Sequence, residues 1–355
     1  MKVLIFGGTG AMGVSLVHLL NSRKNYEVYV TSRGTHNNNG NVTYIKGNAL
    51  ADTDFVKKVL SEQDFDVLID FMVYSTEKLK KRLELYLVHT KQYIFFSSSR
   101  VYASSDEPLV ETSARLLDVC RDSDYLATDE YALAKAREEN LLINNQRQNW
   151  TVIRPYITYN TDRIQLGVYE KENWLYRAMM GREVIFPKDI ASKYTNLTFA
   201  PDVAKNLINL IGNPQALGQI FHIVNDEKIK WYDVADLYKS VYHRITGNIL
   251  DIHYVDNSKG LEKVWNPWQI KYDRLYNRVF NSTKINTLTG VSSYVSVEEG
   301  LTKCLTKFLD NPRWLDYRMN WAYEGWSDKQ TGNWTKLSEI RGKRTKLSYL
   351  KHRLL

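Results

Sequence analysis

The chain has 355 residues, of which 43% are hydrophobic and 25% charged, and its formal net charge is +8. This composition excludes an intrinsically disordered chain and provides enough apolar residues for a large core, or for a domain with a second lobe. No run approaches the roughly 20 apolar residues of a membrane-spanning helix. The two cysteines, Cys120 and Cys304, form no disulfide framework and no metal-spaced cluster, so we expect reduced thiols and no metal site.

The first 150 residues alternate between apolar runs and helical patterns. Strands are predicted at Lys2–Phe6, Tyr26–Thr31, Asn41–Ile45, Val67–Ile69 and Gln92–Ser97. Helices are predicted at Ala11–Leu20, Asp52–Leu60 and Thr76–Leu87. Continuous apolar strands separated by helices are typical of a parallel sheet that is covered on both faces. We therefore predict an α/β fold of the Rossmann type, a doubly wound parallel sheet with a smaller C-terminal lobe.

The pattern becomes less regular further along the chain. A helix is predicted at Asp129–Asn145 and a strand at Trp150–Arg154, which stops at Pro155. Later strands are predicted at Glu183–Phe186, Gln219–Val224 and Asp251–Val255, and helices at Pro201–Leu210 and Trp231–Arg244. These later segments predict a smaller lobe. We place the sheet domain at residues 1–155, with contributions from later segments, the lobe at 156–325 and a tail at 326–355.

The positive charge is concentrated at the end of the chain. From Lys329 onward there are eight Lys and Arg residues and one acid, Glu339, whereas the rest is close to neutral. We therefore expect no nucleic-acid partner for the protein as a whole. The tail is expected to be solvated, to pack on a second subunit, or to contact an anionic membrane surface peripherally. The apolar start of the chain breaks at Gly7, too early for a signal peptide, so we expect a cytoplasmic protein.

A glycine motif, Gly7-x-x-Gly10-x-x-Gly13, joins the first strand to the first helix. In such a turn Gly7 permits the tight bend, Gly10 lets the backbone approach a pyrophosphate, and Gly13 lets the helix pack close to the sheet. The helix then begins near Ala11 and Met12, where N–H groups and the helix dipole favour phosphate. The motif predicts a dinucleotide site.

The second strand ends in Ser32 and Arg33, with no acidic residue to bond a ribose 2′-hydroxyl. Arg33 can pair with a 2′-phosphate, with help from Ser32, which favours NADP over NAD. Alternatively Arg33 stacks on adenine and tolerates either cofactor. Asn48 and the pair Phe71-Met72 fall where the adenine and ribose would lie, although they can equally be ordinary loop and core residues.

A second motif, Tyr131-Ala-Leu-Ala-Lys135, follows a strand that ends in three serines. Oxidation of a carbinol needs a group that takes the hydroxyl proton, and a phenol does so only where its ionised form is stabilised. Lys135 lies one helical turn after Tyr131, on the same face, and its ammonium favours the phenolate. Ser98 or Ser99, at the carboxyl end of a buried strand, can orient the reacting oxygen. The nearby Tyr125 lacks this pairing, because no lysine lies four residues after it.

Together these segments resemble an extended short-chain dehydrogenase/reductase of the NAD-dependent epimerase/dehydratase family, whose members act largely on nucleotide sugars. The resemblance covers roughly residues 1–310, and it rests on the two motifs, on the serine stretch that ends at Val101-Tyr102, and on Arg154-Pro155 followed by Tyr159. It implies Ser98 as the catalytic serine, with Ser99 as the alternative, and a substrate lobe after Pro155.

The resemblance also implies where ligands are bound. Further cofactor contacts are expected from Ala11, Met12, Lys135, Arg154 and Pro155. Substrate contacts are expected from Ser99, Tyr156, Arg274 and Arg278; both arginines fall where the family places phosphate-binding arginines and are spaced for one helical face, or for an ordinary solvated face. The family's dimer contact implies a homodimer through the helix of Tyr131 and its neighbour.

The chain departs from the family pattern in places. The dehydratases of this family carry an Asp-Glu pair where this chain has Ser99-Arg100, which disfavours water elimination. Leu116–Asp129 is longer than the usual spacer and can cap the substrate. We therefore expect an NAD(P)-dependent 4-epimerase or 4-keto-sugar reductase that acts on a nucleotide sugar in surface-glycan synthesis. The alternative is a non-catalytic, nucleotide-binding or RNA-associated member of the superfamily.

Overall fold

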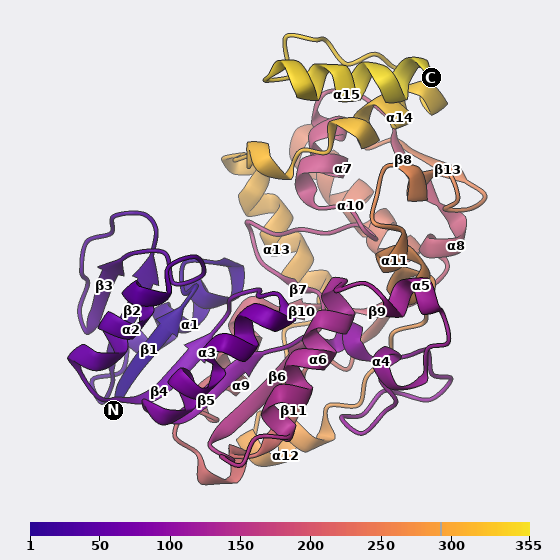
Figure 1. Ribbon diagram of the computed structural model, residues 1–355. Helices are drawn as coiled ribbons and strands as arrows, with labels where there is room; N and C mark the ends of the chain where they lie inside the picture. Colours follow the sequence, from indigo (N-terminus) through magenta and orange to yellow (C-terminus); the bar gives the residue numbers. More distant parts are fainter. Residues whose placement is uncertain (292) are drawn as a thin grey trace. The chain divides into compact units, whose positions relative to one another are not determined.

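The computed structural model describes residues 1–291 and 293–355 (Figure 1). The chain forms two compact units, each assembled from separate segments. The first, here called the sheet unit, comprises Met1–Thr158, Leu197–Asp226 and Phe280–Val295. The second, here called the lobe, comprises Tyr159–Asn196, Glu227–Val279 and Ser296–Leu355.

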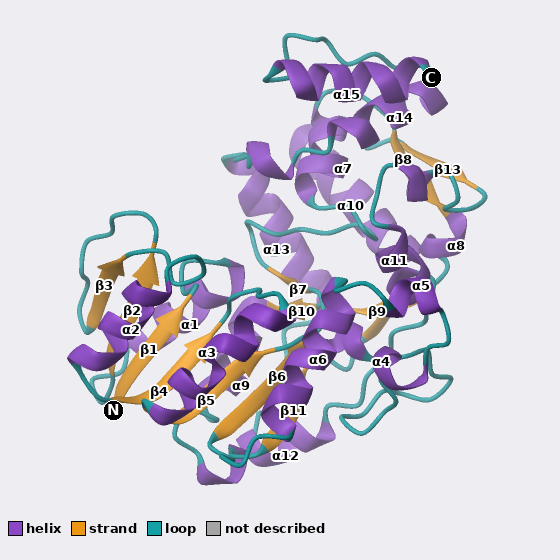
Figure 2. Cartoon of the chain, viewed as in Figure 1, coloured by secondary structure: helices purple, strands orange, loops and turns teal. Residues whose placement is uncertain are grey.

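The sheet unit is built on a seven-stranded parallel sheet in the order β11-β6-β5-β4-β1-β2-β3 (Figure 2). The strands are β1 (Lys2–Phe6), β2 (Glu27–Ser32), β3 (Val42–Lys46), β4 (Phe65–Asp70), β5 (Thr90–Phe96), β6 (Trp150–Pro155) and β11 (Gln219–Ile223). Its helices are α1 (Ala11–Asn21), α2 (Thr53–Glu62), α3 (Thr76–Val88), α4 (Leu116–Val119), α5 (Ser123–Leu126), α6 (Tyr131–Ile143), α9 (Ala200–Ile208) and α12 (Thr283–Thr289). The predicted Rossmann-type fold is confirmed.

Both faces of the sheet carry a hydrophobic core, which is why its strands are continuously apolar. Along β1, Val3 and Ile5 face a core that includes Leu16 of α1, while Leu4 and Phe6 face a second core on the other side. Side chains alternate between the faces of a strand, so only an unbroken apolar run fills both cores.

Two late segments that we grouped with the lobe belong to the sheet unit, to which we expected later segments to contribute. The predicted strand Gln219–Val224 is β11, which pairs in parallel with β6, and its Phe221 and Ile223 enter the first core. The predicted helix Pro201–Leu210 is α9, which packs on α1. An apolar run identifies a buried strand but not the sheet that it joins, so the sequence pattern could not make this assignment.

The lobe combines helices with short strand pairs. Its elements are α7 (Lys171–Met179), β8 (Val184–Pro187), α8 (Lys188–Ala191), β9 (Tyr194–Asn196), β12 (Lys228–Lys230), α10 (Trp231–Thr246), β13 (Ile252–Val255), α11 (Pro267–Gln269), α13 (Val297–Asp310), α14 (Trp321–Thr331) and α15 (Lys343–Leu354). Strand β8 pairs with β13 and β9 with β12, and α10 packs on α13. The remaining strands, β7 (Thr158–Tyr159) and β10 (Thr198–Phe199), lie near the unit boundaries.

The last 30 residues are folded as part of the lobe and do not form a loose tail. Helix α14 runs through the predicted boundary at residue 325 and packs on α15. Tyr349 of α15 is fully buried, and its hydroxyl donates to Asp328 at 2.8 Å. The sequence pattern missed this because charge dominates the segment, while a few apolar residues supply its small core. None of the helices within 1–291 and 293–355 has the length and apolar character needed to cross a bilayer.

Candidate functional site

The glycine turn connects β1 to α1 in a geometry that only glycine accommodates. Gly7 has φ +76°, in the left-handed region that L-residues rarely adopt. A Cβ on Gly13 would lie 2.6 Å from the Cα of Gly8, so the missing side chain lets α1 pack against the turn. Gly10 is the N-cap of α1, and a Cβ there would come within 4 Å only of the Gly7 carbonyl oxygen, at 3.3 Å.

The N-terminus of α1 is suited to an anion. In the part of the chain that the structure describes, no side chain caps this end of the helix, and its first turn carries no acid. The aligned peptide dipoles therefore place partial positive charge beside the glycine turn, where the backbone carries few side chains. These residues fit the pyrophosphate of NAD or NADP, as the sequence predicts for Gly7, Gly10, Ala11, Met12 and Gly13.

The end of β2 adds polar groups next to this turn. Ser32 is buried, and its Oγ lies 2.9 Å from Nε2 of His36 and accepts from the backbone N–H of Gly34 at 3.2 Å. The His36 ring stacks on Tyr44, with centroids 4.9 Å apart. Arg33 is exposed, in keeping with either predicted role. Sequence reasoning missed His36, although its position shortly after the strand end was a usable signal.

Asn48 has a local structural role. Its Oδ1 accepts from the N–H of Ala51 at 3.0 Å, and its carbonyl accepts from Asp52, so it shapes the turn that leads into α2. The bond from Ala51 uses the side-chain amide oxygen of Asn48. A cofactor contact of Asn48 remains a prediction.

The segment Phe71-Met72 lies between the two motifs. A Cβ on Gly7 would be 3.3 Å from both Phe71 Cβ and Met72 Cε, so the segment abuts the glycine turn. The carbonyl of Met72 accepts from Nζ of Lys135 at 3.5 Å. Two motifs that are more than 120 residues apart in sequence therefore meet through this segment.

Tyr131 and Lys135 occupy the first turns of α6. Tyr131 is half-buried at the start of the helix, whereas Lys135 is 1% exposed. The Lys135 ammonium lies 3.0 Å from Oε2 of Glu138 and 4.4 Å from the centroid of the Phe95 ring. The guanidinium of Arg100 lies 5.2 Å from the Tyr131 ring centroid, which places a cation beside the phenol ring.

Glu130 organises the start of α6. It caps the helix by accepting from the N–H of Ala132 at 2.9 Å, and it pairs with Nη2 of Arg100 at 2.7 Å. The hydroxyl of Tyr125 donates to the same carboxylate at 3.2 Å. Burial raises the pKa of Tyr125 far above its ordinary value, so this tyrosine is unsuited to proton transfer.

The three serines after β5 have different hydrogen-bond partners. Ser97 donates to Glu139 at 2.6 Å, and Ser99, fully buried, donates to the carbonyl of Arg154 at 2.9 Å. Ser98 is also buried, and its Oγ accepts from the N–H of Arg100 at 3.2 Å. The predicted substrate contact of Ser99, and its role as alternative catalytic serine, do not fit this geometry, since its hydroxyl is bound inside the fold.

Arg154 is also bound inside the fold. Its Nε and Nη2 donate to the two oxygens of Glu139, each at 2.7 Å, and Nη1 donates to the carbonyl of Glu111 at 3.0 Å. These bonds disfavour a cofactor contact through the guanidinium, and that contact stays a prediction. Pro155 ends β6 and is half-buried, and Tyr156 is 2% exposed with its ring 5.0 Å from Phe280, so the predicted substrate contact of Tyr156 has no exposed surface to use.

The predicted substrate arginines of the lobe are buried and paired. Arg274 and Arg278 both form ion pairs with Asp273, and the Nε of Arg274 donates to the carbonyl of Gly167 at 2.9 Å. Residues Ile270–Arg274 form a π-helical turn, so the spacing on one α-helical face was wrong. Because charged groups are buried only with partners, we assign this cluster to the core of the lobe and no longer to substrate phosphate.

A buried acidic cluster lies around Lys135, and sequence reasoning did not single it out. Asp70, at the end of β4, accepts from the N–H of Met72 and from the hydroxyls of Tyr74 and Tyr93 at 2.9 to 3.0 Å. Burial raises the pKa of Asp70 to about 6 and that of Glu138 to about 7, against the opposing effect of Lys135. The signal available in the sequence was an acid that ends an otherwise apolar strand.

These shifted pKa values predict a pH-dependent stability. An acid whose pKa is higher in the folded chain than in the unfolded one contributes stability that is complete below its unfolded pKa and is lost as pH rises through the folded value. For Glu138 that window runs from 4.5 to about 7. We expect Glu138→Gln to reduce the loss of unfolding free energy between pH 5 and 8 by on the order of 2 kcal/mol, measured by urea unfolding. Glu84→Gln, at an exposed surface pair, is the control; parallel wild-type and Glu138→Gln profiles would contradict the assignment.

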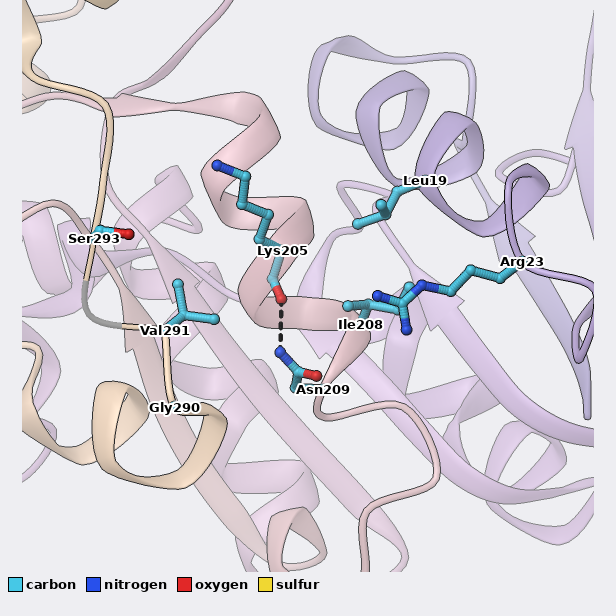
Figure 3. A pocket seen from close by; sticks show the side chains of 8 residues that line it. All are labelled: Leu19, Arg23, Lys205, Ile208, Asn209, Gly290, Val291 and Ser293. Carbon is cyan, nitrogen blue, oxygen red and sulfur yellow. Dashed lines mark hydrogen bonds between the residues drawn. The ribbon is translucent and has the colours of Figure 1, made fainter.

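A pocket of about 360 Å³ lies elsewhere on the sheet unit (Figure 3). Leu19 and Arg23 approach it from the C-terminal end of α1, and Lys205, Ile208 and Asn209 approach it from α9. It is therefore at the opposite end of α1 from the glycine turn, where the dipole disfavours phosphate. Lys205 is paired there with Asp202 at 2.7 Å, so this pocket is not the dinucleotide site.

Solved structures share the fold. The chain matches a dTDP-glucose 4,6-dehydratase from Bacillus anthracis str. Ames in complex with NAD, with a TM-score of 0.68 and 16% identity over 90% of this chain and 99% of that one. It also matches a UDP-glucuronic acid 4-epimerase from Bacillus cereus in complex with UDP-glucuronic acid and NAD, with a TM-score of 0.65 and 15% identity over 87% and 100% of the two chains. At these identities the likeness establishes the fold.

A curated relative is closer in sequence. The chloroplast stem-loop binding protein of 41 kDa b from Arabidopsis thaliana is 28% identical in an alignment of 251 residues that covers 66% of this chain. The match spans 61% of that protein's own length. The sequence profile of the NAD dependent epimerase/dehydratase family matches residues 3–223, from the first residues of β1 to the end of β11. The chain therefore belongs to the NAD dependent epimerase/dehydratase family.

Proposed function

We propose that the chain is an NAD(P)-dependent enzyme that acts on a nucleotide-activated sugar, as a 4-epimerase or a 4-keto-sugar reductase in surface-glycan precursor synthesis. The observation that carries this proposal is the approach of Phe71-Met72 to both Gly7 and Lys135, which brings the dinucleotide turn and the Tyr-Lys helix to one place. The dTDP-glucose dehydratase and UDP-glucuronic acid epimerase of the same fold support the substrate class.

Each residue of the proposed triad has a separate task. NAD(P), when bound, supplies the hydride acceptor and donor. Tyr131 takes the proton from the sugar hydroxyl, or returns it, through its phenolic oxygen. The Lys135 ammonium favours the phenolate and holds the ribose of the cofactor, and the Ser98 hydroxyl orients the reacting oxygen.

The surroundings of Tyr131 favour redox chemistry over elimination of water. Arg100 occupies the position of the glutamate that serves the dehydratases, and its guanidinium lies beside the phenol ring. A cation that is held at 2.7 Å by Glu130 cannot act as the base that removes a sugar C–H proton. We further propose a homodimer through α3 and α6, which pack on each other in the sheet unit.

Mass spectrometry of small molecules released by denaturing the purified protein tests the proposed function. Near-stoichiometric NAD or NADP would indicate a cofactor recycled in place and so an epimerase. An empty protein whose Tm rises with added NADPH would indicate a reductase that exchanges its cofactor. A protein that neither retains nor is stabilised by any nicotinamide dinucleotide would overturn the proposal.

Cofactor preference depends on the exposed residue after β2. We expect Arg33→Asp to weaken NADPH binding by at least about tenfold more than NADH binding, because a carboxylate repels the 2′-phosphate and accepts from a 2′-hydroxyl. Calorimetric titration of both cofactors measures the difference. An equal loss for both would instead support stacking of Arg33 on adenine.

A second candidate function, RNA association, is favoured by one relative and one helix. The relative is the protein named for stem-loop binding, and the helix is α15, where Lys343, Arg344 and Lys351 are exposed. If this function holds, a labelled RNA hairpin binds with a steep salt dependence, and replacing these three residues with Glu lowers both affinity and slope. Unchanged binding by the triple variant would exclude α15 as the contact.

A further inference from the structure

The lobe contains a pocket that no part of the proposed reaction uses. It has a volume of about 370 Å³ and is lined by side chains from α7 and from the last 42 residues of the chain, beyond the family match that ends at residue 223. Four of its lining residues are aromatic: Tyr176, Trp314, Tyr317 and Trp321. That volume is at the lower end of the range for small-molecule sites.

The aromatic walls are held in fixed orientations. The Tyr176 ring stands at 85° to the rings of both Trp314 and Trp321, with centroids 5.4 and 6.4 Å away. Trp314 is supported from behind by Phe308, at 5.1 Å, and the Tyr176 hydroxyl donates to Glu339 at 3.0 Å. Tyr317, also in the lining, is 80% exposed.

Each acidic side chain that lines the pocket forms an ion pair with a basic side chain. The carboxylate of Asp316 pairs with Arg341, which also lines the pocket. The carboxylate of Glu339 pairs with Arg182 at 3.0 Å. Because each acid already has a cation, the lining has little net charge to attract an ion, and a neutral ligand can bond to both members of a pair.

A pyranose ring matches this combination of surfaces. Its axial C–H groups form an apolar face that packs on an aromatic ring, and its edge carries adjacent hydroxyls, each a donor and an acceptor. Where a carboxylate lies beside a guanidinium, as in Asp316 and Arg341, the carboxylate accepts from one hydroxyl and the guanidinium donates to the next.

We propose that this pocket of the lobe binds a neutral hexopyranose unit of a saccharide. It is a carbohydrate site separate from the proposed nucleotide-sugar site. The proposal rests on the lining residues alone and does not depend on the proposed function of the sheet unit. The pocket would bind the sugar even if the sheet unit bound no nicotinamide dinucleotide.

The full chain is titrated with methyl glycosides of glucose, galactose, mannose and N-acetylglucosamine. Tryptophan fluorescence and saturation-transfer NMR report binding, because Trp314 and Trp321 line the site. We expect at least one glycoside to bind with a Kd on the order of 1 mM, and Tyr317→Ala and Arg341→Gln each to weaken it at least about tenfold. The two side chains are 80% and 86% exposed, so these variants should fold, which their Tm values check. Trp334→Ala removes an exposed aromatic of the lobe outside the pocket and is the matched control.

Three results would overturn the proposal. The first is the failure of all four glycosides to bind. The second is binding that survives in Tyr317→Ala and Arg341→Gln, or is lost equally in Trp334→Ala, which would place the sugar elsewhere. The third is tighter binding of tetramethylammonium or inorganic phosphate than of any glycoside, which would make the pocket an ion site.

Discussion

Turnover of a nucleotide sugar is expected to fall at least about 100-fold in Tyr131→Phe, with little change in Tm. The substitution keeps the ring at the start of α6 and its contact with Arg100, and it removes only the phenolic oxygen. A panel of UDP- and dTDP-activated hexoses and 4-keto-hexoses provides the assay, read by NAD(P)H absorbance and product analysis.

A neighbouring tyrosine supplies the matched control. Tyr125→Phe removes a buried hydroxyl that donates to Glu130, so it should lower stability by about 1 kcal/mol and leave turnover within a few-fold. Near-normal turnover in Tyr131→Phe would remove Tyr131 as the acid/base. An equal loss of turnover in both variants would indicate that the effect comes from disturbing the Glu130 cap of α6.

The features that the sequence predicted well are those that depend on local chain geometry. Apolar runs and helical periodicity located β1 to β6 and α6 to within a few residues, because burial of both sheet faces imposes that pattern directly. The glycine turn was predictable for a similar reason: Gly7 and Gly13 are required by a positive φ and by a close backbone contact.

The errors concern side chains whose partners could not be identified from the sequence pattern. Arg154 bonds to Glu139, and Arg278 to Asp273, and nothing in the spacing of a basic residue tells whether a buried acid will meet it. Ser99 begins a 3₁₀ turn and its hydroxyl donates to the carbonyl of Arg154, a partner that the three-serine pattern does not reveal. The cluster of Asp70 and Glu138 around Lys135 needs the fold itself, since it joins β4 to α6.

One buried arginine, Arg177, links two helices of the lobe. We therefore expect the largest loss of stability from Arg177→Met. Arg177, on α7, is fully buried and donates from Nη1 to Glu324 at 2.7 Å and to Asp328 at 2.9 Å, both on α14. Burial opposes ionisation of Asp328, yet Arg177 and two hydroxyl donors hold its pKa below the ordinary value. Removing the guanidinium leaves two buried carboxylates without their cation, which should cost about 3–5 kcal/mol of unfolding free energy by urea titration at pH 7.

Comparison with a surface pair and with a compensated variant separates charge burial from lost packing. Lys188→Met breaks an exposed ion pair with Asp256 in the same lobe and should cost less than about 1 kcal/mol. Adding Glu324→Gln and Asp328→Asn to Arg177→Met neutralises both stranded acids, so part of the lost stability should return, more so at pH 7 than at pH 5. If residues 326–355 were instead a loosely attached tail, Asp328 would reach water in the single variant, and Arg177→Met would cost no more than Lys188→Met.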